Sequence, residues 1–168
     1  TGNVRWAFRT AGPIMQPPTS WEGRAYAGSG DGFVYCLEAA TGKLLWRFDA
    51  SPVARRIPVY GYLCSTWPVN SGVLIHDGAA YFAAGIIDYD GTYLYALNAK
   101  TGELKWVNEQ SGWADPALRK GVSAQGNLTV ANGRLCMAGG NIVSPAEYDL
   151  NTGAYLGRVP RDGSPESN

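Results

Sequence analysis

The chain has 168 residues, with 14 basic and 14 acidic side chains and a formal net charge of zero. This balance argues against nucleic acid or an anionic membrane as the main partner, because both bind clustered basic surfaces. Gly, Pro, Tyr and Trp are abundant, which favours short strands joined by tight turns, and no apolar run reaches the roughly 18 residues of a membrane-spanning helix.

The first two elements of each repeat flank a two-residue turn. Glu22-Gly23, Asp77-Gly78 and Asn132-Gly133 recur at a constant interval of 55 residues. Asp-Gly or Asn-Gly between alternating apolar runs predicts a tight hairpin. Each turn should therefore join an inner strand to a second strand. These strands are expected at 15–21 and 24–28, at 70–76 and 79–84, and at 125–131 and 134–138.

A Thr-Gly turn closes each repeat, after a third strand and before a fourth. Every repeat is then a four-stranded antiparallel meander. Residues 3–9 are interpreted as a lone fourth strand of a preceding repeat. The third strands are predicted at 33–38, 92–98 and 146–150, and the fourth strands at 43–48, 103–108 and 154–159.

A tryptophan follows the glycine of the turn by four residues, except in the third repeat, where Gly157 takes its place. Glycine permits the positive φ that a tight turn needs, and threonine can hold the turn by local hydrogen bonds. The flat tryptophan ring on the outer strand is available to cover the next repeat. The predicted docking residues are Trp6, Gly42, Trp46, Gly102, Trp106 and Gly153.

A four-stranded meander of this size cannot cover both its faces, so the copies must stack. Radial stacking predicts an all-β fold of β-propeller blades, about three blades plus one outer strand. Propellers typically have about four to eight blades, so the ring is incomplete, and the remaining blades or a second chain are expected partners. The predicted division is an outer strand of a preceding blade at 1–12, blades at 13–50, 67–110 and 123–162, inserted loops at 51–66 and 111–122, and a tail at 163–168.

Two of the repeats carry a family resemblance. The segments VYCLEAATGKLLWRF and LYALNAKTGELKWVN closely resemble pyrroloquinoline-quinone-type (PQQ-like) β-propeller repeats, whose pattern is roughly Ala-x-Asp-x-x-Thr-Gly-x-x-x-Trp. The second segment fits best, the first fits with two substitutions, and the third copy, EYDLNTGAYLG, lacks the Trp. The matching positions are Ala96, Asn98, Thr101, Gly102 and Trp106, then Thr41, Gly42 and Trp46, and then Asp149, Thr152 and Gly153.

The resemblance implies one of three kinds of protein: quinoprotein alcohol and sugar dehydrogenases, a lipoprotein that helps assemble outer-membrane barrels, and bacterial export-side proteins of unknown role. Most work outside the cytoplasm, so a periplasmic or extracellular location is expected. Dehydrogenases of the family typically carry adjacent cysteines beside the quinone, an acidic and amide set around calcium, and a catalytic Asp. Cys36, Cys64 and Cys136 are far apart. No cofactor is therefore expected, and PQQ or calcium would need a complete propeller.

Long connections gather at one end of the predicted blades, which we call the long-loop face. The segments 49–68, 85–91 and 109–123 all emerge there, opposite to the tight turns. Aromatic residues mixed with both signs of charge suit a protein, peptide or carbohydrate ligand. The same residues would also pack the loops on one another, and the sequence leaves both interpretations open. The candidates are Arg55, Arg56, Tyr60, Tyr62, Trp67, Asn70, Asp88, Tyr89, Trp113 and Gln125.

Three further features are interpreted as structural. Asp88-x-Asp90-Gly91 is more typical of a capped turn than of a calcium loop. His76, the single histidine, is expected at the end away from the long loops, where no catalytic triad can be built around it. Asn70 and Gln125 begin inner strands and would lie near the propeller axis, where amides hydrogen-bond one another or a ligand.

The sequence thus predicts a non-catalytic propeller segment of an exported bacterial protein, which binds or scaffolds through its long-loop face. The alternative is part of a quinoprotein dehydrogenase or carbohydrate-acting enzyme whose catalytic residues lie in absent blades. A purely structural spacer is the third hypothesis.

Overall fold

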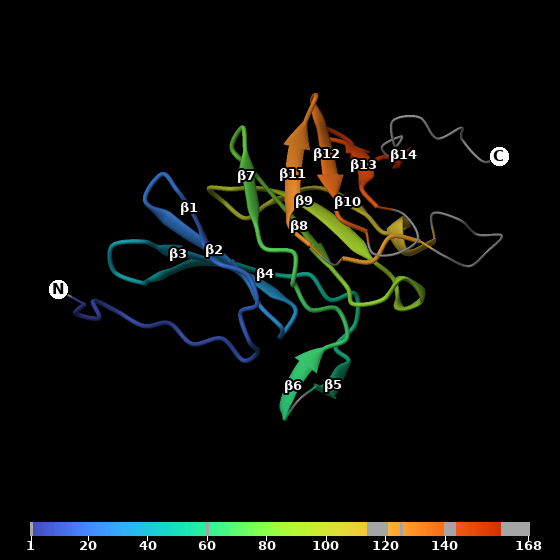
Figure 1. Cartoon of the computed structure of the whole chain (residues 1–168). Coiled ribbons are helices and arrows are strands. Elements are labelled where there is room, and N and C mark those ends of the chain that lie inside the picture. The colour runs from blue at the N-terminus through green and yellow to red at the C-terminus, as the bar shows by residue number, and fades with distance from the viewer. Residues whose placement is uncertain (1, 60, 114–120, 125, 140–143, 159–168) are drawn as a thin grey trace.

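Three four-stranded antiparallel sheets lie side by side in the structure, a computed structural model that describes residues 2–59, 61–113, 121–124, 126–139 and 144–158 (Figure 1). Each sheet follows chain order, as a meander does, which confirms the predicted fold class. Within the described residues, no helix is long and apolar enough to cross a membrane.

The strands of the three sheets, here called blades, recur in the same order. The first blade has β1 (Thr19–Trp21), β2 (Arg24–Gly28), β3 (Phe33–Glu38) and β4 (Leu44–Asp49). The second has β7 (Leu74–His76), β8 (Ala79–Ala84), β9 (Tyr93–Asn98) and β10 (Leu104–Asn108). The third has β11 (Leu128–Ala131), β12 (Arg134–Met137), β13 (Ala146–Asp149) and β14 (Tyr155–Arg158).

The hairpin turns have the backbone that their dipeptides predict. Glu22, Asp77 and Asn132 adopt φ values of 44°, 46° and 50°, and the glycine after each is also at positive φ. Two successive positive φ angles define the type I′ turn, whose twist matches that of the flanking strands. The turn residues therefore set the strand pairing of all three blades.

The inner strands begin later than the predicted positions 15, 70 and 125. In the first blade Pro17 and Pro18 have no N–H to donate to a neighbouring strand. In the second, the Ser71 hydroxyl accepts the Ala83 N–H at 2.8 Å and so replaces a backbone partner. Position 125 lies outside the described residues, and β11 begins at Leu128.

The prediction of a strand at 3–9 is wrong, because the structure has no strand there. A strand requires a backbone partner, and the described residues supply none to this segment. This segment and the residues just after it nevertheless contact the first blade. The rings of Phe8 and Tyr35 are 5.5 Å apart, and the Ala11 N–H donates to the Asp31 carboxylate at 2.9 Å.

A two-stranded hairpin lies inside the predicted inserted loop. It pairs β5 (Arg56–Val59) with β6 (Tyr62–Ser65) and projects away from the three sheets, below them in the view of Figure 1. Each strand has only four residues, and an alternation this short around Gly61 is too weak a pattern to predict a hairpin.

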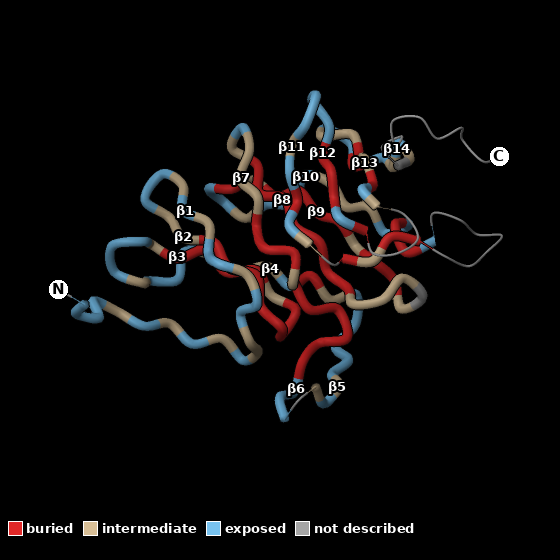
Figure 2. The backbone as a smooth tube through the Cα atoms, viewed as in Figure 1, coloured by how far each residue is buried: buried red, intermediate tan, exposed pale blue. Residues whose placement is uncertain are grey.

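The core lies where the blades face each other, as the buried stretches of Figure 2 show. Trp46 and Tyr26 of the first blade both donate to the Ala99 carbonyl of the second, at 3.2 and 3.0 Å. A Cβ at Gly102 would lie only 2.8 Å from the Trp46 ring, so the indole occupies the space that the glycine leaves free. Hydrogen bonds and close packing thus join the two blades at one point.

The same contact recurs between the second and third blades. Trp106 and Tyr81 donate to the Leu150 carbonyl at 3.0 and 3.4 Å, and a Cβ at Gly153 would lie 2.4 Å from the Trp106 ring. The two aromatic rings are 5.9 Å apart in both interfaces. We call this pair of rings and its carbonyl the Tyr–Trp clamp.

The N-terminal segment contributes half of such a contact to the first blade. Trp6 donates to the Ala39 carbonyl at 3.0 Å, and a Cβ at Gly42 would lie 2.6 Å from its ring. Trp6 therefore occupies the position at the first blade that Trp46 occupies at the second, although residues 3–9 form no strand.

The third blade lacks the outgoing half of the clamp. Strand register aligns Cys136 with Glu147, and Glu147 with Gly157. In the first blade the corresponding positions hold Tyr26 and Trp46 on either side of Cys36. At these three register positions the third blade therefore has Cys136, Glu147 and Gly157 where the first blade has Tyr26, Cys36 and Trp46, so both aromatic rings of the clamp are missing.

Candidate functional site

Three inserted segments meet at the long-loop face: the β5–β6 hairpin and the short 3₁₀ helices η1 (Asp88–Asp90) and η2 (Ser111–Trp113). The two 3₁₀ helices touch, because a Cβ at Gly112 would lie 2.3 Å from the Asp88 carbonyl oxygen. An ion pair of 2.9 Å between Arg55 and Asp90 connects the base of the hairpin to η1. The long loops are thus packed on one another.

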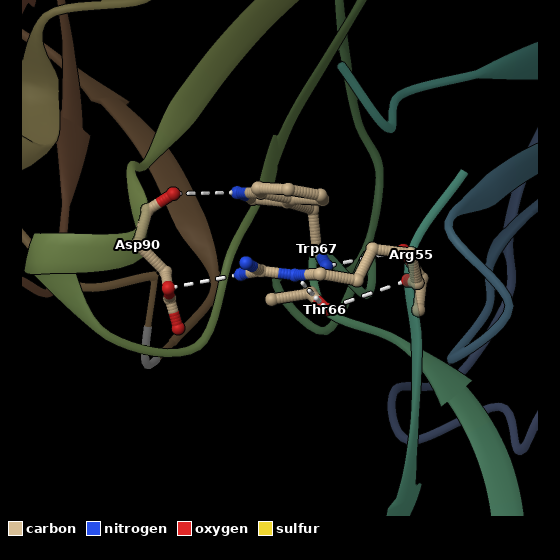
Figure 3. A network of polar contacts seen from close by, with 5 residues as sticks. Arg55, Thr66, Trp67 and Asp90 are labelled. Atoms are coloured by element: carbon tan, nitrogen blue, oxygen red, sulfur yellow. Dashed lines mark hydrogen bonds and ion pairs between the residues drawn. The ribbon is translucent and has the colours of Figure 1, made fainter. Parts of the chain in front are cut away.

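Arg55, Thr66, Trp67 and Asp90 form one network (Figure 3). The Arg55 guanidinium carbon lies 4.9 Å from the centre of the Trp67 ring, and its Nε donates to the Thr66 hydroxyl at 3.0 Å. The Trp67 indole N–H donates to the Asp90 carbonyl at 2.8 Å. Asp90 therefore receives one bond at its carboxylate and another at its backbone.

The exposure of the side chains shows whether the ion pair or the Trp67 ring contributes more to the stability of the face. Arg55 and Asp90 have side chains 51% and 30% exposed, and ion pairs this open contribute roughly 0–1 kcal/mol. Trp67 is only 5% exposed and meets the Tyr93 ring edge to face at 6.3 Å. Its ring is enclosed by protein, which favours, for Trp67, loop packing among the two interpretations that the sequence leaves open.

The two aspartates of the Asp-x-Asp-Gly sequence have protein partners. Asp88 Oδ2 accepts the Gly121 N–H at 3.0 Å, and Asp90 pairs with Arg55. The Gly91 N–H donates to the Asp88 carbonyl, which closes a turn. These bonds support the interpretation as a turn, and the described residues contain no group of three or more His, Cys, Asp and Glu that could hold a metal.

The remaining candidates divide by exposure. Arg56, Tyr62 and Trp113 are exposed, and Trp113 keeps 44% of its surface open. Asn70 is half-buried near the start of the second blade. Tyr60, Gln125 and the side chain of Tyr89 lie outside the described part of the structure.

A pocket of about 240 Å³ opens on the long-loop face beside the hairpin. Its walls combine Met15, Val59, Tyr62 and Ile86 with the Asn70 amide. A second pocket, of about 280 Å³, shares Met15, Asn70 and Ile86 with the first and extends toward Gln16 and Ala124. The structure therefore brings two of the predicted residues, Tyr62 and Asn70, into one cavity.

Two amide side chains lie close together near the starts of the inner strands, but they are not Asn70 and Gln125, which the sequence predicts there; Gln125 lies outside the described residues. A Cβ at Gly72 would be 3.2 Å from Asn127 Oδ1 and 3.3 Å from Gln16 Cβ, so side chains of the first and third blades meet against the second. Gln16 and Asn127 flank Gly72, and a separate pocket of about 290 Å³, lined by Gly72, Leu74 and Asn127 among others, opens beside them.

The three cysteines are buried and form no disulfide. Burial raises the pKa of the Cys36 thiol to about 11 and also raises the pKa of Cys136. Both thiols therefore stay protonated near neutral pH and are poor nucleophiles. Cys64 lies in the wall of the first pocket, and His76 contacts Asp77 at the opposite end of its blade.

Some residues of the clamp and of the pocket were not predicted from the sequence. Tyr26 and Tyr81 belong to the clamp, and their separation of 55 residues, the same as that of the hairpin turns, was the available signal. Val59 and Ile86 line the pocket and had no such signal, because each occurs in a loop insertion without a counterpart in the other repeats.

Comparison with known proteins identifies relatives for nearly the whole chain. The family model described as "Outer membrane protein assembly factor BamB" matches residues 1–166. The dehydrogenase subunit of a quinone alcohol dehydrogenase of Gluconacetobacter polyoxogenes is 35% identical over 124 residues, which cover 73% of this chain and 16% of that protein. The BamB protein of Nitrosomonas eutropha is 30% identical over 105 residues, 62% of this chain and 22% of that protein.

The solved structures agree on the fold. The crystal structure of BamB from Moraxella catarrhalis matches with a TM-score of 0.64 at 18% identity, and the match covers 92% of this chain and 38% of that chain. The present chain spans less than a quarter of the length of the two sequence relatives above.

Proposed function

Because the chain belongs to the family of PQQ-like β-propeller repeats whose model is described as outer membrane protein assembly factor BamB, we propose that it is a non-catalytic segment of an exported bacterial propeller protein. Its role is to bind or scaffold a partner through the long-loop face. The names of the BamB relatives support a partner protein and a location outside the cytoplasm.

The observation that carries this proposal is the construction of the long-loop face. The insertions there are held by the buried Trp67 and by the Arg55–Asp90 pair, so they form a fixed surface. Tyr62 and Trp113 remain exposed on it, and an open apolar pocket lies beside the hairpin. Exposed large aromatic residues on the same face as an apolar pocket are typical of protein interaction sites.

The described residues do not fit a quinone site. The resemblance to quinoprotein dehydrogenases implies adjacent cysteines, whereas Cys36, Cys64 and Cys136 are buried in three different strands. The implied acidic set around calcium has no counterpart in the described ranges, where Asp88 and Asp90 are engaged in the loop packing.

The test uses the intact protein that contains this segment. A photo-cross-linking amino acid replaces Trp113 on the long-loop face or, as a control, Leu104 on the outer strand of the second blade, which is similarly exposed. We expect a covalent adduct of defined mass from position 113 and none from position 104 after irradiation in the bacterial host. Adducts of equal yield from both positions would refute a specific role of this face.

Part of a dehydrogenase is the second candidate, favoured by the 35% identity to a quinone alcohol dehydrogenase subunit. It requires catalytic residues from blades outside this chain. Adding PQQ and calcium to the intact protein and following dye reduction with a primary alcohol distinguishes the two. Calcium-dependent reduction would establish the enzyme, and its absence is the result expected for a scaffold.

A further inference from the structure

We propose that the pocket beside the β5–β6 hairpin binds an extended peptide segment of a partner protein, which inserts an apolar side chain there. The inference rests on the proposed function, because the pocket opens on the long-loop face, and it names the kind of partner. Three parts of the chain build the walls. They are the approach to β1 with Met15, the hairpin with Val59 and Tyr62, and the segments around Asn70 and Ile86.

The strand register explains why the hairpin presents an apolar wall. Val59 pairs with Tyr62, and Ile57 pairs with Cys64. Residues directly opposite in an antiparallel pair point to the same face. Val59, Tyr62 and Cys64 therefore share the side of the hairpin that lines the pocket, while Arg56 and Ser65 share the other side.

The size and the polarity of the pocket favour an apolar side chain over a cofactor or a carbohydrate as the ligand. Sites for small molecules and cofactors usually measure roughly 300–1,000 Å³, and this pocket measures about 240 Å³. A single large side chain fits this volume better than a whole cofactor does. A carbohydrate would need several hydrogen-bonding groups, whereas Asn70 supplies the one side-chain amide in these walls. An apolar side chain is the ligand group that matches both properties.

The Asn70 side chain indicates that the inserted apolar side chain comes with a hydrogen-bond donor. Its Oδ1 atom is buried and has no hydrogen-bond partner among the described residues. A buried acceptor without a donor is costly, and such groups in proteins are usually satisfied by a ligand, water or protein. Because this atom has almost no accessible surface, a backbone N–H of a bound peptide would satisfy it only once the Asn70 side chain turns toward the pocket.

The neighbouring pocket extends the site past the segments that lead into the inner strands. It measures about 280 Å³ and shares Met15, Asn70 and Ile86 with the first pocket. In an extended peptide, side chains alternate between two faces, so residues i and i+2 point the same way. A peptide with two apolar residues separated by one would place one side chain in each pocket, on either side of the shared wall.

The exposed apolar residues at the mouth of the pocket favour a protein as the partner. Met15 and Tyr62 are 62% and 61% exposed although both are large and apolar. Methionine and tyrosine are enriched in protein interfaces, where they supply contact area and, for methionine, adaptability. Without an occupant, these two side chains leave apolar surface in contact with water at the mouth of the pocket.

The experiment selects binders from a phage-displayed library of nine-residue peptides on the immobilised intact protein. Enriched peptides are labelled with fluorescein, and their dissociation constants are measured by fluorescence anisotropy. Met15→Glu and Tyr62→Glu put a carboxylate at the pocket mouth, and Leu104→Glu makes the same change on a comparably exposed residue of an outer strand. Melting curves of all three variants establish that the fold is retained.

We expect selected peptides to carry two apolar residues separated by one. Their binding should weaken about thirtyfold or more in Met15→Glu and Tyr62→Glu, the effect of losing one interface hot spot, and less than about threefold in Leu104→Glu. Bound peptide should also slow the reaction of Cys64, which lies in the pocket wall, with a small thiol reagent.

Equal affinities in the pocket variants and the control would overturn the assignment of the pocket, as would a failure of the library to yield any peptide. If binding instead depends on Trp113, tested by Trp113→Ala, the pocket is wrong while the long-loop face retains its role. The cross-linking experiment at position 113 decides the proposed function independently of the peptide selection.

Discussion

Gly102→Ala tests why glycine and tryptophan recur together. At Gly102 the backbone has φ +77°, and an added Cβ would lie 2.8 Å from the Trp46 ring. Gly23 offers a matched control, with φ +70° and nothing within 4 Å of the same added atom. Both substitutions impose the strain of a left-handed residue, but only the first pushes against the indole.

The expected magnitudes follow from these two terms. Left-handed backbone costs an alanine about 1–2 kcal/mol, which applies to Gly102→Ala and Gly23→Ala alike. Displacing the Trp46 ring adds an overpacking cost of about 1–3 kcal/mol and weakens its hydrogen bond to the Ala99 carbonyl. Gly102→Ala should therefore be less stable than Gly23→Ala by about 2 kcal/mol, or roughly 4–8 °C in melting temperature for a chain of this size.

The assay is urea unfolding followed by circular dichroism, with a double-mutant cycle between Gly102→Ala and Trp46→Ala. When the indole is removed, the added methyl group meets no ring, so the extra cost of Gly102→Ala should disappear. Equal losses of stability in Gly102→Ala and Gly23→Ala, or a cycle with no coupling, would refute the docking role of the pair.

Three further outcomes are expected. Trp46→Ala should cost about 3–5 kcal/mol and Trp113→Ala less than about 1 kcal/mol in urea unfolding, because only the first ring docks two blades; equal costs would contradict this. Burial raises the pKa of Cys36 from about 9 to about 11, so its contribution to stability is complete below pH 9 and is lost as the pH rises to 11. Over that range, the parent should lose about 2 kcal/mol more than Cys36→Ala in unfolding free energy, and parallel curves would exclude the thiol as the cause. At the long-loop face, Arg55→Ala should lower stability by about 1 kcal/mol or less and Trp67→Ala by about 3–5 kcal/mol, and the reverse order in thermal melts would show that the ion pair is the anchor.

The repeated part of the fold was predictable because each repeat solves the same physical problem. The turn threonines show this: Thr41, Thr101 and Thr152 all accept the N–H two residues further along, at 3.2–3.3 Å. At Asp149, backbone and side-chain bonds from Asn151 and Thr152 also hold the carboxylate and lower its pKa. A side chain that satisfies its own turn needs no distant partner, so its role follows from local sequence.

The long-loop face was predictable as a location, but the roles of its residues were not. Trp67 and Trp113 look alike in the sequence, and one is buried while the other is exposed. The difference comes from Asp90, which receives the Trp67 indole N–H across 23 positions of the chain. Pairings between two different insertions have no periodicity, so only the folded structure shows which aromatic ring is the anchor.

The clamp and the pocket are built from different parts of the chain. The clamp uses residues inside the repeat, and Tyr26 and Tyr81 donate to equivalent carbonyls of the next blade. The pocket uses residues outside it, from the β5–β6 hairpin and from Ile86. Substitutions at Tyr62 therefore alter the surface without touching a blade interface, whereas substitutions at Trp46 alter the interface. If the pocket binds a peptide as proposed, its specificity can change independently of blade stacking, because the two depend on different residues at different ends of the strands.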